Sequence, residues 1–182
     1  MSNVYCIGDL HFGHTHIHKF RTQFPSETVH RAYLMEKWIA TIGKRDVVFV
    51  MGDAAFTQDG LNDIGLLAGR KILIRGNHDL LPTEAYLKVF EEVYASYLYK
   101  GCWLTHIPIH PSELYGRSNI HGHCHRGGPE EVHTCRSTIR GHHVGAKATY
   151  FNTAAEFLDP PYTPMKFQTI KEKINATISR SS

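Results

Sequence analysis

The sequence has few cysteines, no long apolar run and no CxxC pair. A chain of 182 residues does not need disulfides for stability, so we interpret its four cysteines as buried or incidental thiols. The first residues, MSNVYCIGDLHFGH, reach Asp9 and His11 after only a short apolar stretch, which predicts neither a signal peptide nor a membrane span. We therefore expect a cytoplasmic protein in a reducing compartment, with no membrane partner.

The chain also lacks a concentration of charge. Lys and Arg number 20 and Asp and Glu number 17, and the net charge of +3 is not gathered in a basic run. A nucleic-acid partner is therefore not indicated. The length and the apolar fraction of 42% are typical of a globular protein. We expect one domain over residues 1–182, and the oligomeric state stays open.

Histidine, in contrast, is abundant. The chain has 14 histidines, more than its nine phenylalanines or nine tyrosines, and imidazole is the commonest ligand of transition metals. Three of them lie in NIHGHCHRGG (119–128). This stretch could be a polar loop, a zinc site that uses Cys124, or one part of a site assembled from distant segments.

The apolar pattern predicts an α/β protein in which sheets pack together with helices outside. Continuous apolar runs predict buried strands over 3–8, 46–52 and 71–76, and shorter strands are expected over 96–99, 102–107, 118–123 and 148–157. The predicted helices cover 26–43, 59–69, 83–94 and 168–178. Ser26 and Thr83 are their expected caps, and the expected apolar faces consist of Val29, Tyr33, Ile39 and Ile42 in the first helix and Ile170, Ile174 and Ile178 in the last.

Five of the apolar runs end in polar residues, usually beside a glycine. These endings are GDLH, GDAA, GNHD, THIP and HGHCH. Because the carboxyl ends of parallel strands meet at one edge of a sheet, we expect the five endings to lie close together. Asp9 and His11 are two residues apart, as are His123 and His125, so each pair can direct its side chains to the same side of an extended chain.

The endings provide more metal ligands than one ion needs. A tetrahedral zinc ion takes four ligands, or three and a water molecule. Seven candidates suit two ions that share a carboxylate and lie roughly 3.5 to 4 Å apart. Nitrogen and oxygen ligands favour manganese, iron or zinc, and the sequence does not choose among them. The candidates are Asp9, His11, Asp53, Asn77, His106, His123 and His125.

The segments GDLHFGH, GDAAF, RGNHD, LTHIPI and HGHCH, in this order, resemble the five signature blocks of the calcineurin-like metallophosphoesterases. GDLHFGHTHIHKF further resembles the small bacterial and phage single-domain members, and ATYFNTAAEF resembles the strand that closes their second sheet. The resemblance implies a four-layer α/β/β/α sandwich of two packed mixed sheets. It also implies two ions, one held by Asp9, His11, Asp53 and His125, the other by Asp53, Asn77, His106 and His123.

The resemblance implies a hydrolase in which a hydroxide between the ions attacks the phosphorus of a small phosphomonoester or phosphodiester, with nucleotides among the candidates. His78 would protonate the leaving oxygen, and Asp79 would orient its imidazole. We expect Arg75 and His14 to contact the substrate. A nuclease or a protein phosphatase on the same core is the alternative, and a non-catalytic scaffold is a third reading.

Other polar residues have weaker assignments. We expect His16, His18 and His30 to be solvated and His121 to point away from the ions. The irregular segment 126–145 is interpreted as an exposed loop or a loose hairpin. Its basic residues would form either a lip that selects the substrate or a solvated surface. They are Arg136, Arg140, His142 and His143.

Overall fold

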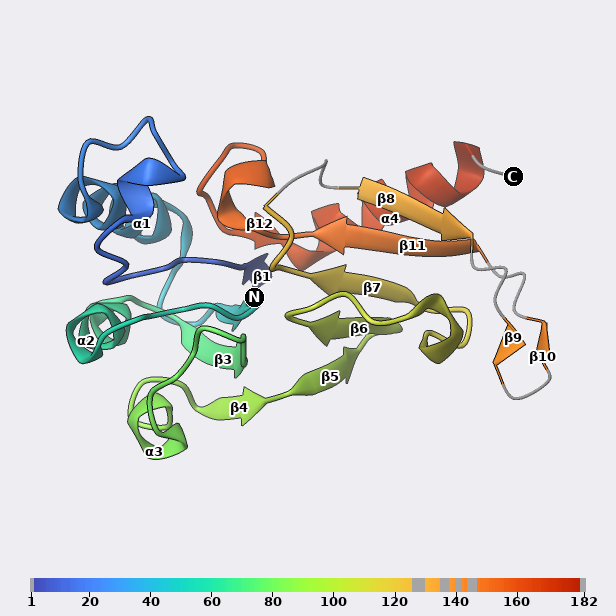
Figure 1. Ribbon diagram of the computed structural model, residues 1–182, viewed down its shortest axis with the longest axis horizontal. Helices are drawn as coiled ribbons and strands as arrows, with labels where there is room; N and C mark the ends of the chain where they lie inside the picture. Colours follow the sequence, from blue (N-terminus) through green and yellow to red (C-terminus); the bar gives the residue numbers. More distant parts are fainter. Residues whose placement is uncertain (1, 126–129, 135–137, 140–141, 144–146, 181–182) are drawn as a thin grey trace.

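The computed structural model of the chain describes residues 2–125, 130–134, 138–139, 142–143 and 147–180 (Figure 1). It contains two five-stranded sheets. The first has the order β12 (Met165–Lys166), β1 (Val4–Ile7), β2 (Val47–Val50), β3 (Arg70–Ile74) and β4 (Glu92–Tyr94). The second has the order β5 (Ser96–Tyr99), β6 (Cys102–Thr105), β7 (Ser118–His121), β11 (Lys147–Asn152) and β8 (Glu130–Thr134).

Both sheets are mixed. In the first, β1 to β4 run parallel and β12 pairs with β1 in the antiparallel direction. In the second, β6, β7 and β11 run parallel, whereas the edge strands β5 and β8 are antiparallel to their neighbours. The predicted arrangement of two mixed sheets with helices is confirmed.

The helices lie around these sheets (Figure 1). α4 packs against β11 and β8 of the second sheet and also contacts β1 and β12 of the first. No helix among the described residues is both long enough and apolar enough to cross a membrane. In the part of the chain that the structure describes, the α-helices are α1 (Glu27–Thr41), α2 (Gln58–Leu66), α3 (Thr83–Tyr86) and α4 (Phe167–Arg180). The short 3-10 helices there are η1 (Ile17–Lys19), η2 (Pro111–Glu113) and η3 (Ala155–Phe157).

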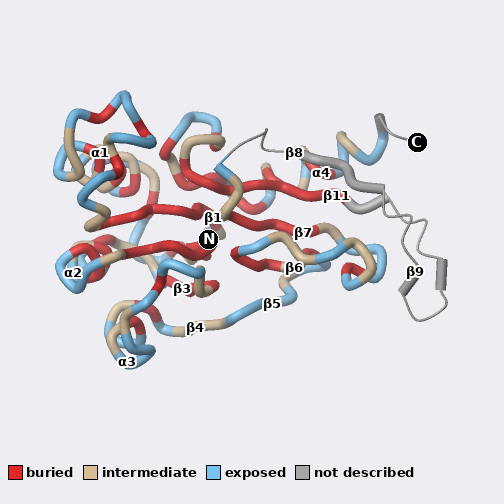
Figure 2. The backbone as a smooth tube through the Cα atoms, viewed as in Figure 1, coloured by how far each residue is buried: buried red, intermediate tan, exposed pale blue. Residues whose placement is uncertain are grey.

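One hydrophobic core joins the two sheets. The ring of Phe49 on β2 lies 5.9 Å from that of Tyr97 and 5.1 Å from that of Tyr99, both on β5. Tyr99 in turn packs edge-on against Phe167 at the start of α4. Figure 2 shows β1, β2 and β7 as almost entirely buried. This packing fixes the ends of strands from both sheets relative to one another.

Helix α1 is capped as predicted, but only half of its predicted apolar face is buried. Ile42, at the C-cap, lies in the core and Tyr33 packs against it, as predicted. The Ser26 hydroxyl accepts a hydrogen bond from the Val29 amide, whereas the Val29 and Ile39 side chains are 46% and 67% exposed. The buried side chains of α1 are His30, Leu34 and Trp38, which are spaced four residues apart. In α4, Ile170 and Ile174 are buried as predicted, but Ile178 is 45% exposed.

The predicted helix over 83–94 is right only for its first turn. α3 ends at Tyr86, and Pro82 rather than Thr83 takes the N-cap position, without a side-chain capping bond. Glu92–Tyr94 form β4, which pairs with β3. The Glu91 amide already donates a hydrogen bond to the Lys71 carbonyl. The open edge of β3 thus offers backbone partners, and these outweigh the weak helical propensity of the segment.

Part of the segment 126–145 lies in strands. β8 forms an edge of the second sheet, which corrects the interpretation of this stretch as an exposed loop. β9 (Thr138–Ile139) pairs antiparallel with β10 (His142–His143), which agrees with the hairpin alternative. Arg136 and Arg140, two residues of the predicted lip, lie outside the described residues.

Candidate metal centre

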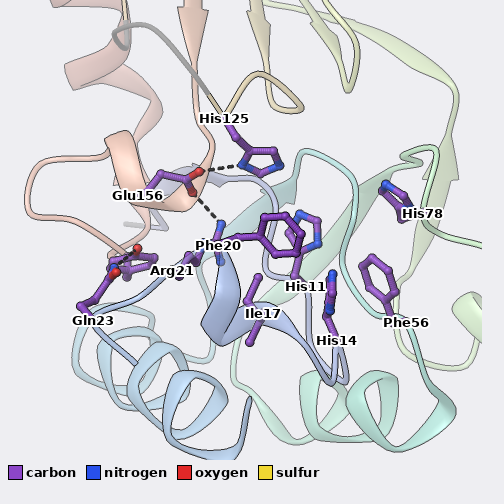
Figure 3. Close-up of a pocket in the computed structure, with 11 residues that line it drawn as sticks. His11, His14, Ile17, Phe20, Arg21, Gln23, Phe56, His78, His125 and Glu156 are labelled. Carbon is purple, nitrogen blue, oxygen red and sulfur yellow. Dashed lines mark hydrogen bonds and ion pairs between the residues drawn. The ribbon is translucent and has the colours of Figure 1, made fainter. Parts of the chain in front are cut away.

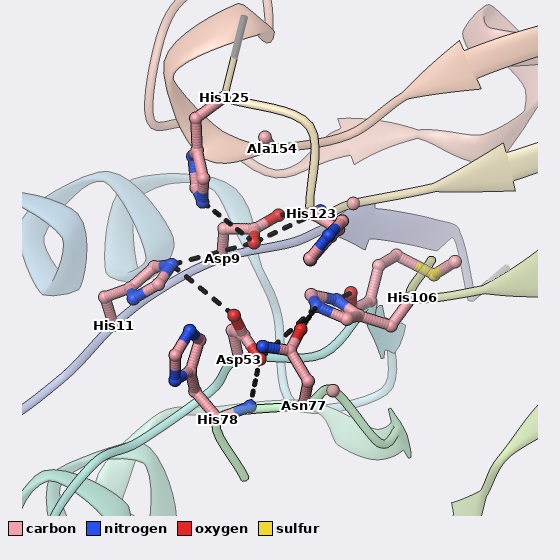
Figure 4. A network of polar contacts seen from close by, with 12 residues as sticks. Asp9, His11, Asp53, Asn77, His78, His106, His123, His125 and Ala154 are labelled. Atoms are coloured by element: carbon pink, nitrogen blue, oxygen red, sulfur yellow. Dashed lines mark hydrogen bonds and ion pairs between the residues drawn. The ribbon is translucent and has the colours of Figure 1, made fainter. Parts of the chain in front are cut away.

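The five polar strand endings converge at one place between the sheets (Figure 4). Backbone hydrogen bonds fasten the endings to one another: the Asp9 amide donates to the Gly52 carbonyl, the His11 amide to Asp53, and the Gly122 amide to His106. The fold therefore brings the five endings together, as the sequence predicts. The residues follow β1, β2 and β3 of the first sheet and β6 and β7 of the second. They are Asp9, His11, Asp53, Asn77, His106, His123 and His125.

The backbone at this place is strained. Asp9, His11, Asp53 and His123 have φ angles of 57°, 54°, 49° and 68°, in the left-handed region that residues other than glycine rarely adopt. Each such residue costs about 1–3 kcal/mol. All four belong to the predicted ligand set, so the strain is concentrated where the chain turns to direct these side chains inward.

Two glycines allow the close approach of the carboxylates. A Cβ atom on Gly76 would lie 2.3 Å from Asp53 Oδ1, and one on Gly122 would lie 2.5 Å from Asp9 Oδ2. Both distances are far shorter than a van der Waals contact. These glycines therefore provide the room for Asp9 and Asp53 at the centre, and any side chain at either position would displace a carboxylate.

The side chains form two groups that could each hold a metal ion. One group consists of Asp9, His11 and His125, and the other of Asp9, Asp53 and His106, with donor atoms within 4.8 Å of one another in each. His11 Nε2 lies 3.6 Å from Asp9 Oδ1 and 3.8 Å from Asp53 Oδ2, and His125 Nε2 lies 3.5 Å from Asp9 Oδ1. These separations exceed ordinary hydrogen bonds but suit atoms that share an ion.

The chemistry of His11 tests whether a metal fits. Its side chain is buried, and neither Nδ1 nor Nε2 has a hydrogen-bond partner among the described residues. A buried polar atom without a partner is costly, and proteins rarely tolerate it without a role. A divalent cation next to Nε2 would provide the missing partner, so the residues fit a metal.

Asp53 and His106 are held ready for such an ion. Burial raises the pKa of Asp53, but the hydrogen bond with His106 and the charge of His106 lower it by more than burial raises it. The pKa is therefore about 2, and the carboxylate is ionised. His106 Nδ1 donates to the Met51 carbonyl at 2.8 Å, which leaves Nε2 directed at Asp53 and at Asn77 Oδ1. A ring fixed in this way is typical of a metal ligand.

The fifth ending is tied to the first. The His123 amide donates to Asp9 Oδ2 at 2.9 Å, and its ring lies edge-on to that of His106 at 5.1 Å. Cys124 is half-buried and belongs to neither donor group. The described part of this stretch, residues 119–125, thus belongs to a site built from distant segments.

Comparison with known proteins agrees with this geometry. Residues 2–151 match the family described as calcineurin-like phosphoesterases. The chain belongs to this family. The resemblance noted in the signature blocks is therefore confirmed.

Three related proteins match part of the chain in sequence, and one solved structure shares its fold. Two are the Gene 66 proteins of two Mycobacterium phages, 36% and 40% identical over 84 residues, and a third is an uncharacterised protein of Methanocaldococcus jannaschii, 30% identical over 84 residues. The matched segment spans 43% of this chain and 41% of each phage protein, less than half of either. A protein of unknown function from Aquifex aeolicus shares the fold, with a TM-score of 0.66, 21% identity, and coverage of 94% of this chain and 99% of that one.

In this calcineurin-like chain, His78 lies at the centre, but among the described contacts the Asp79 carboxylate bonds backbone amides and not the His78 ring. The His78 amide donates to Asp53 Oδ1 at 2.8 Å, and its ring stacks on Phe56. The Asp79 carboxylate is buried and accepts hydrogen bonds from the amides of Asp53, Ala54 and Gly76. The support that we expected Asp79 to give the His78 ring is not among the contacts of the described residues; Asp79 instead joins the ends of β2 and β3.

Arg75 holds the loop that carries Asn77 and His78. Its guanidinium donates to the carbonyls of Asp79 and Leu81 and to the Thr83 hydroxyl. The phosphate contact that we expected of Arg75 stays a prediction, and the geometry favours a role in fixing the loop.

The remaining histidines differ in their surroundings. His14 lines a hollow next to His11, with its ring 6.0 Å from that of His11. His121 is buried, and its Nδ1 bonds the Gly122 carbonyl. His16 is exposed as expected.

The expectation for His30 is wrong. His30 is fully buried and accepts a hydrogen bond from Arg21. Burial and the charge of Arg21 lower the pKa of His30 to about 3, so its imidazole is neutral.

Sequence reasoning missed a chain of ionic contacts that runs from His125 to the buried Arg21. His125 Nδ1 lies 2.6 Å from Glu156 Oε1, and Arg21 donates to the other Glu156 oxygen at 2.6 Å (Figure 3). Arg21 also donates to the Asp9 carbonyl. A signal was available, because Glu156 follows β11 as the other candidates follow their strands, and a sixth polar ending could have been counted.

Glu156 directs His125 Nε2 toward the centre, so we predict that Glu156→Gln weakens at least one metal-binding step about tenfold. The measurement is a calorimetric titration of metal-free protein with Mn²⁺. Glu84→Gln, on the exposed start of α3, is the control and should bind as the wild type does. Unchanged Mn²⁺ affinity in the folded Glu156→Gln variant would rule out this role.

Proposed function

We propose that the chain hydrolyses small phosphate esters with two divalent metal ions. The observation that carries the proposal is the position of Asp53, whose Oδ2 lies 3.8 Å from His11 Nε2 and whose Oδ1 lies 3.3 Å from His106 Nε2. His11 is also buried, and its ring nitrogens have no hydrogen-bond partner among the described residues. Asp9, His11, Asp53 and His125 would hold one ion, and Asp53, Asn77, His106 and His123 the other. Manganese suits these nitrogen and oxygen ligands, with iron, zinc or nickel as alternatives.

When bound, the two ions would ionise an attacking water near neutral pH and neutralise charge on the phosphoryl oxygens. The residues of the chain supply the geometry. His78 is positioned by its amide bond to Asp53 and by stacking on Phe56, and its exposed ring lines the same hollow as His11 and His125. From there it would give a proton to the leaving oxygen.

The space around the centre favours a phosphodiester over a phosphomonoester. One hollow adjoins His11 and His125, and a second adjoins Asn77 and His106. Each has a volume of about 400 Å³. A phosphodiester carries two organic groups, and a centre with a hollow on either side has room for both, whereas a monoester would fill one.

Two alternatives act on larger substrates. A nuclease or a protein phosphatase on this core would need an extended binding surface, and the weak net charge of +3 gives no support to a polyanion. A non-catalytic scaffold would have no use for a complete ligand set and for the strained backbone that presents it.

A hydrolysis panel with Mn²⁺ tests the proposal. We expect turnover of bis-p-nitrophenyl phosphate to exceed that of p-nitrophenyl phosphate, and turnover of 2′,3′- or 3′,5′-cyclic nucleotides or dinucleotide polyphosphates to exceed that of single-stranded DNA. Faster cleavage of single-stranded DNA would favour the nuclease. If metal-loaded protein turned over none of these substrates, the result would contradict the proposal and favour the non-catalytic scaffold.

For the proton transfer, we predict that His78→Ala lowers turnover of an alkyl phosphate ester by about 100-fold. Esters of p-nitrophenol should lose far less, because their leaving group needs no proton. His16→Ala, an exposed histidine outside the hollow, serves as the control. An equal loss on both kinds of ester, with normal metal content, would refute the role of His78.

A further inference from the structure

The hollow beside His11 leads away from the candidate metal centre (Figure 3). His11, His78 and His125 form the end of the hollow that faces the centre. A phosphate group bound there would direct one of its organic substituents into this space. The walls of the hollow therefore bear on what that substituent is.

Aromatic side chains form much of these walls. The ring of His14 lies 4.6 Å from that of Phe56 and 5.8 Å from that of Phe20. Phe56 lies 5.3 Å from the ring of His11, so the aromatic surface begins directly beside the candidate ligand. Ile17 adds an aliphatic contact. Such a surface offers ring faces for stacking.

Phe20 is the informative member of this group. It follows η1, and its side chain is 75% exposed. An exposed phenyl ring alone needs no explanation. This one, however, lines a hollow that ends at two candidate metal ligands, whereas Leu66 on α2, which is 79% exposed, does not line it. The exposed face of Phe20 is available to a ligand in the hollow.

Hydrogen-bonding groups are also present in the hollow. The amide of Gln23 donates to the hydroxyl of Tyr162, and both residues line the space. Gln23 lies away from His78 and Phe56 in Figure 3. Aromatic faces near the phosphate and polar groups beyond them are the combination that recognises a nucleobase, which has flat faces and polar edges.

We propose that this hollow binds a flat aromatic group of the substrate, of the nucleobase kind, whose phosphate lies at the metal centre. The inference rests on the proposed function, which it deepens by naming the substrate class. The substrates would be phosphate esters whose organic group carries a flat aromatic ring, such as nucleoside phosphates. A sugar phosphate or the phosphoserine side chain of a peptide has no flat aromatic ring to stack on the walls of this hollow.

Phosphonates test the inference through binding alone, because their P–C bond is not hydrolysed. Benzylphosphonate and methylphosphonate carry the same charged group and differ in the ring. We expect calorimetry on Mn²⁺-loaded protein to give about tenfold tighter binding of benzylphosphonate. Phe20→Ala should remove most of this preference without changing the affinity for methylphosphonate, whereas Leu66→Ala should keep the preference.

The outcomes separate this inference from the proposed function. Equal affinity for the two phosphonates, or a preference that survives Phe20→Ala, would overturn the aromatic site and leave the metal centre standing. A lack of binding of both phosphonates would overturn the proposed function and this inference with it. Cyclohexylmethylphosphonate distinguishes stacking from general apolar contact, and binding as tight as that of benzylphosphonate would also count against a site for flat rings.

Discussion

The close placement of two buried carboxylates is the constraint on which the rest of this structure depends. Asp9 and Asp53 are 0% and 1% exposed, and their oxygens belong to one group of donor atoms. No lysine or arginine side chain forms an ion pair with either carboxylate among the described residues; histidine rings and the amides of His78 and His123 are the neighbours. Two like charges in a region of low dielectric repel each other strongly. Divalent cations between the carboxylates would remove that cost. A metal centre would thus account for the strained backbone at the ligands, the glycines beside the carboxylates and the buried His11 nitrogens without hydrogen bonds among the described residues.

Several of those features keep the centre rigid without belonging to it. Asp79 binds the loops after β2 and β3 through three amides, and Glu156 and Arg21 connect His125 to the Asp9 backbone. Strained backbone at the ligands can persist only if the surroundings determine it in this way. The same hydrophobic core that packs the two sheets together therefore also sets the distances between ligands that come from different sheets.

Much of the fold and the centre could be predicted from the sequence, because the ligands follow apolar runs and parallel strands bring such endings together. The prediction failed where packing or pairing decides. Glu92–Tyr94 form a strand because the edge of β3 was open, and His30 is buried because Arg21 gives it a partner. The contacts of Asp79 and Glu156 involve residues far apart in the chain, which spacing along the sequence does not reveal.

Anomalous diffraction from a crystal of the full chain grown with Mn²⁺ tests the central claim most directly. The account predicts two peaks roughly 3.5 to 4 Å apart, on either side of the Asp53 carboxylate. One peak should lie against His11 and His125, and the other against Asn77, His106 and His123. A single peak, or two peaks that do not share Asp53, would contradict the two-metal centre.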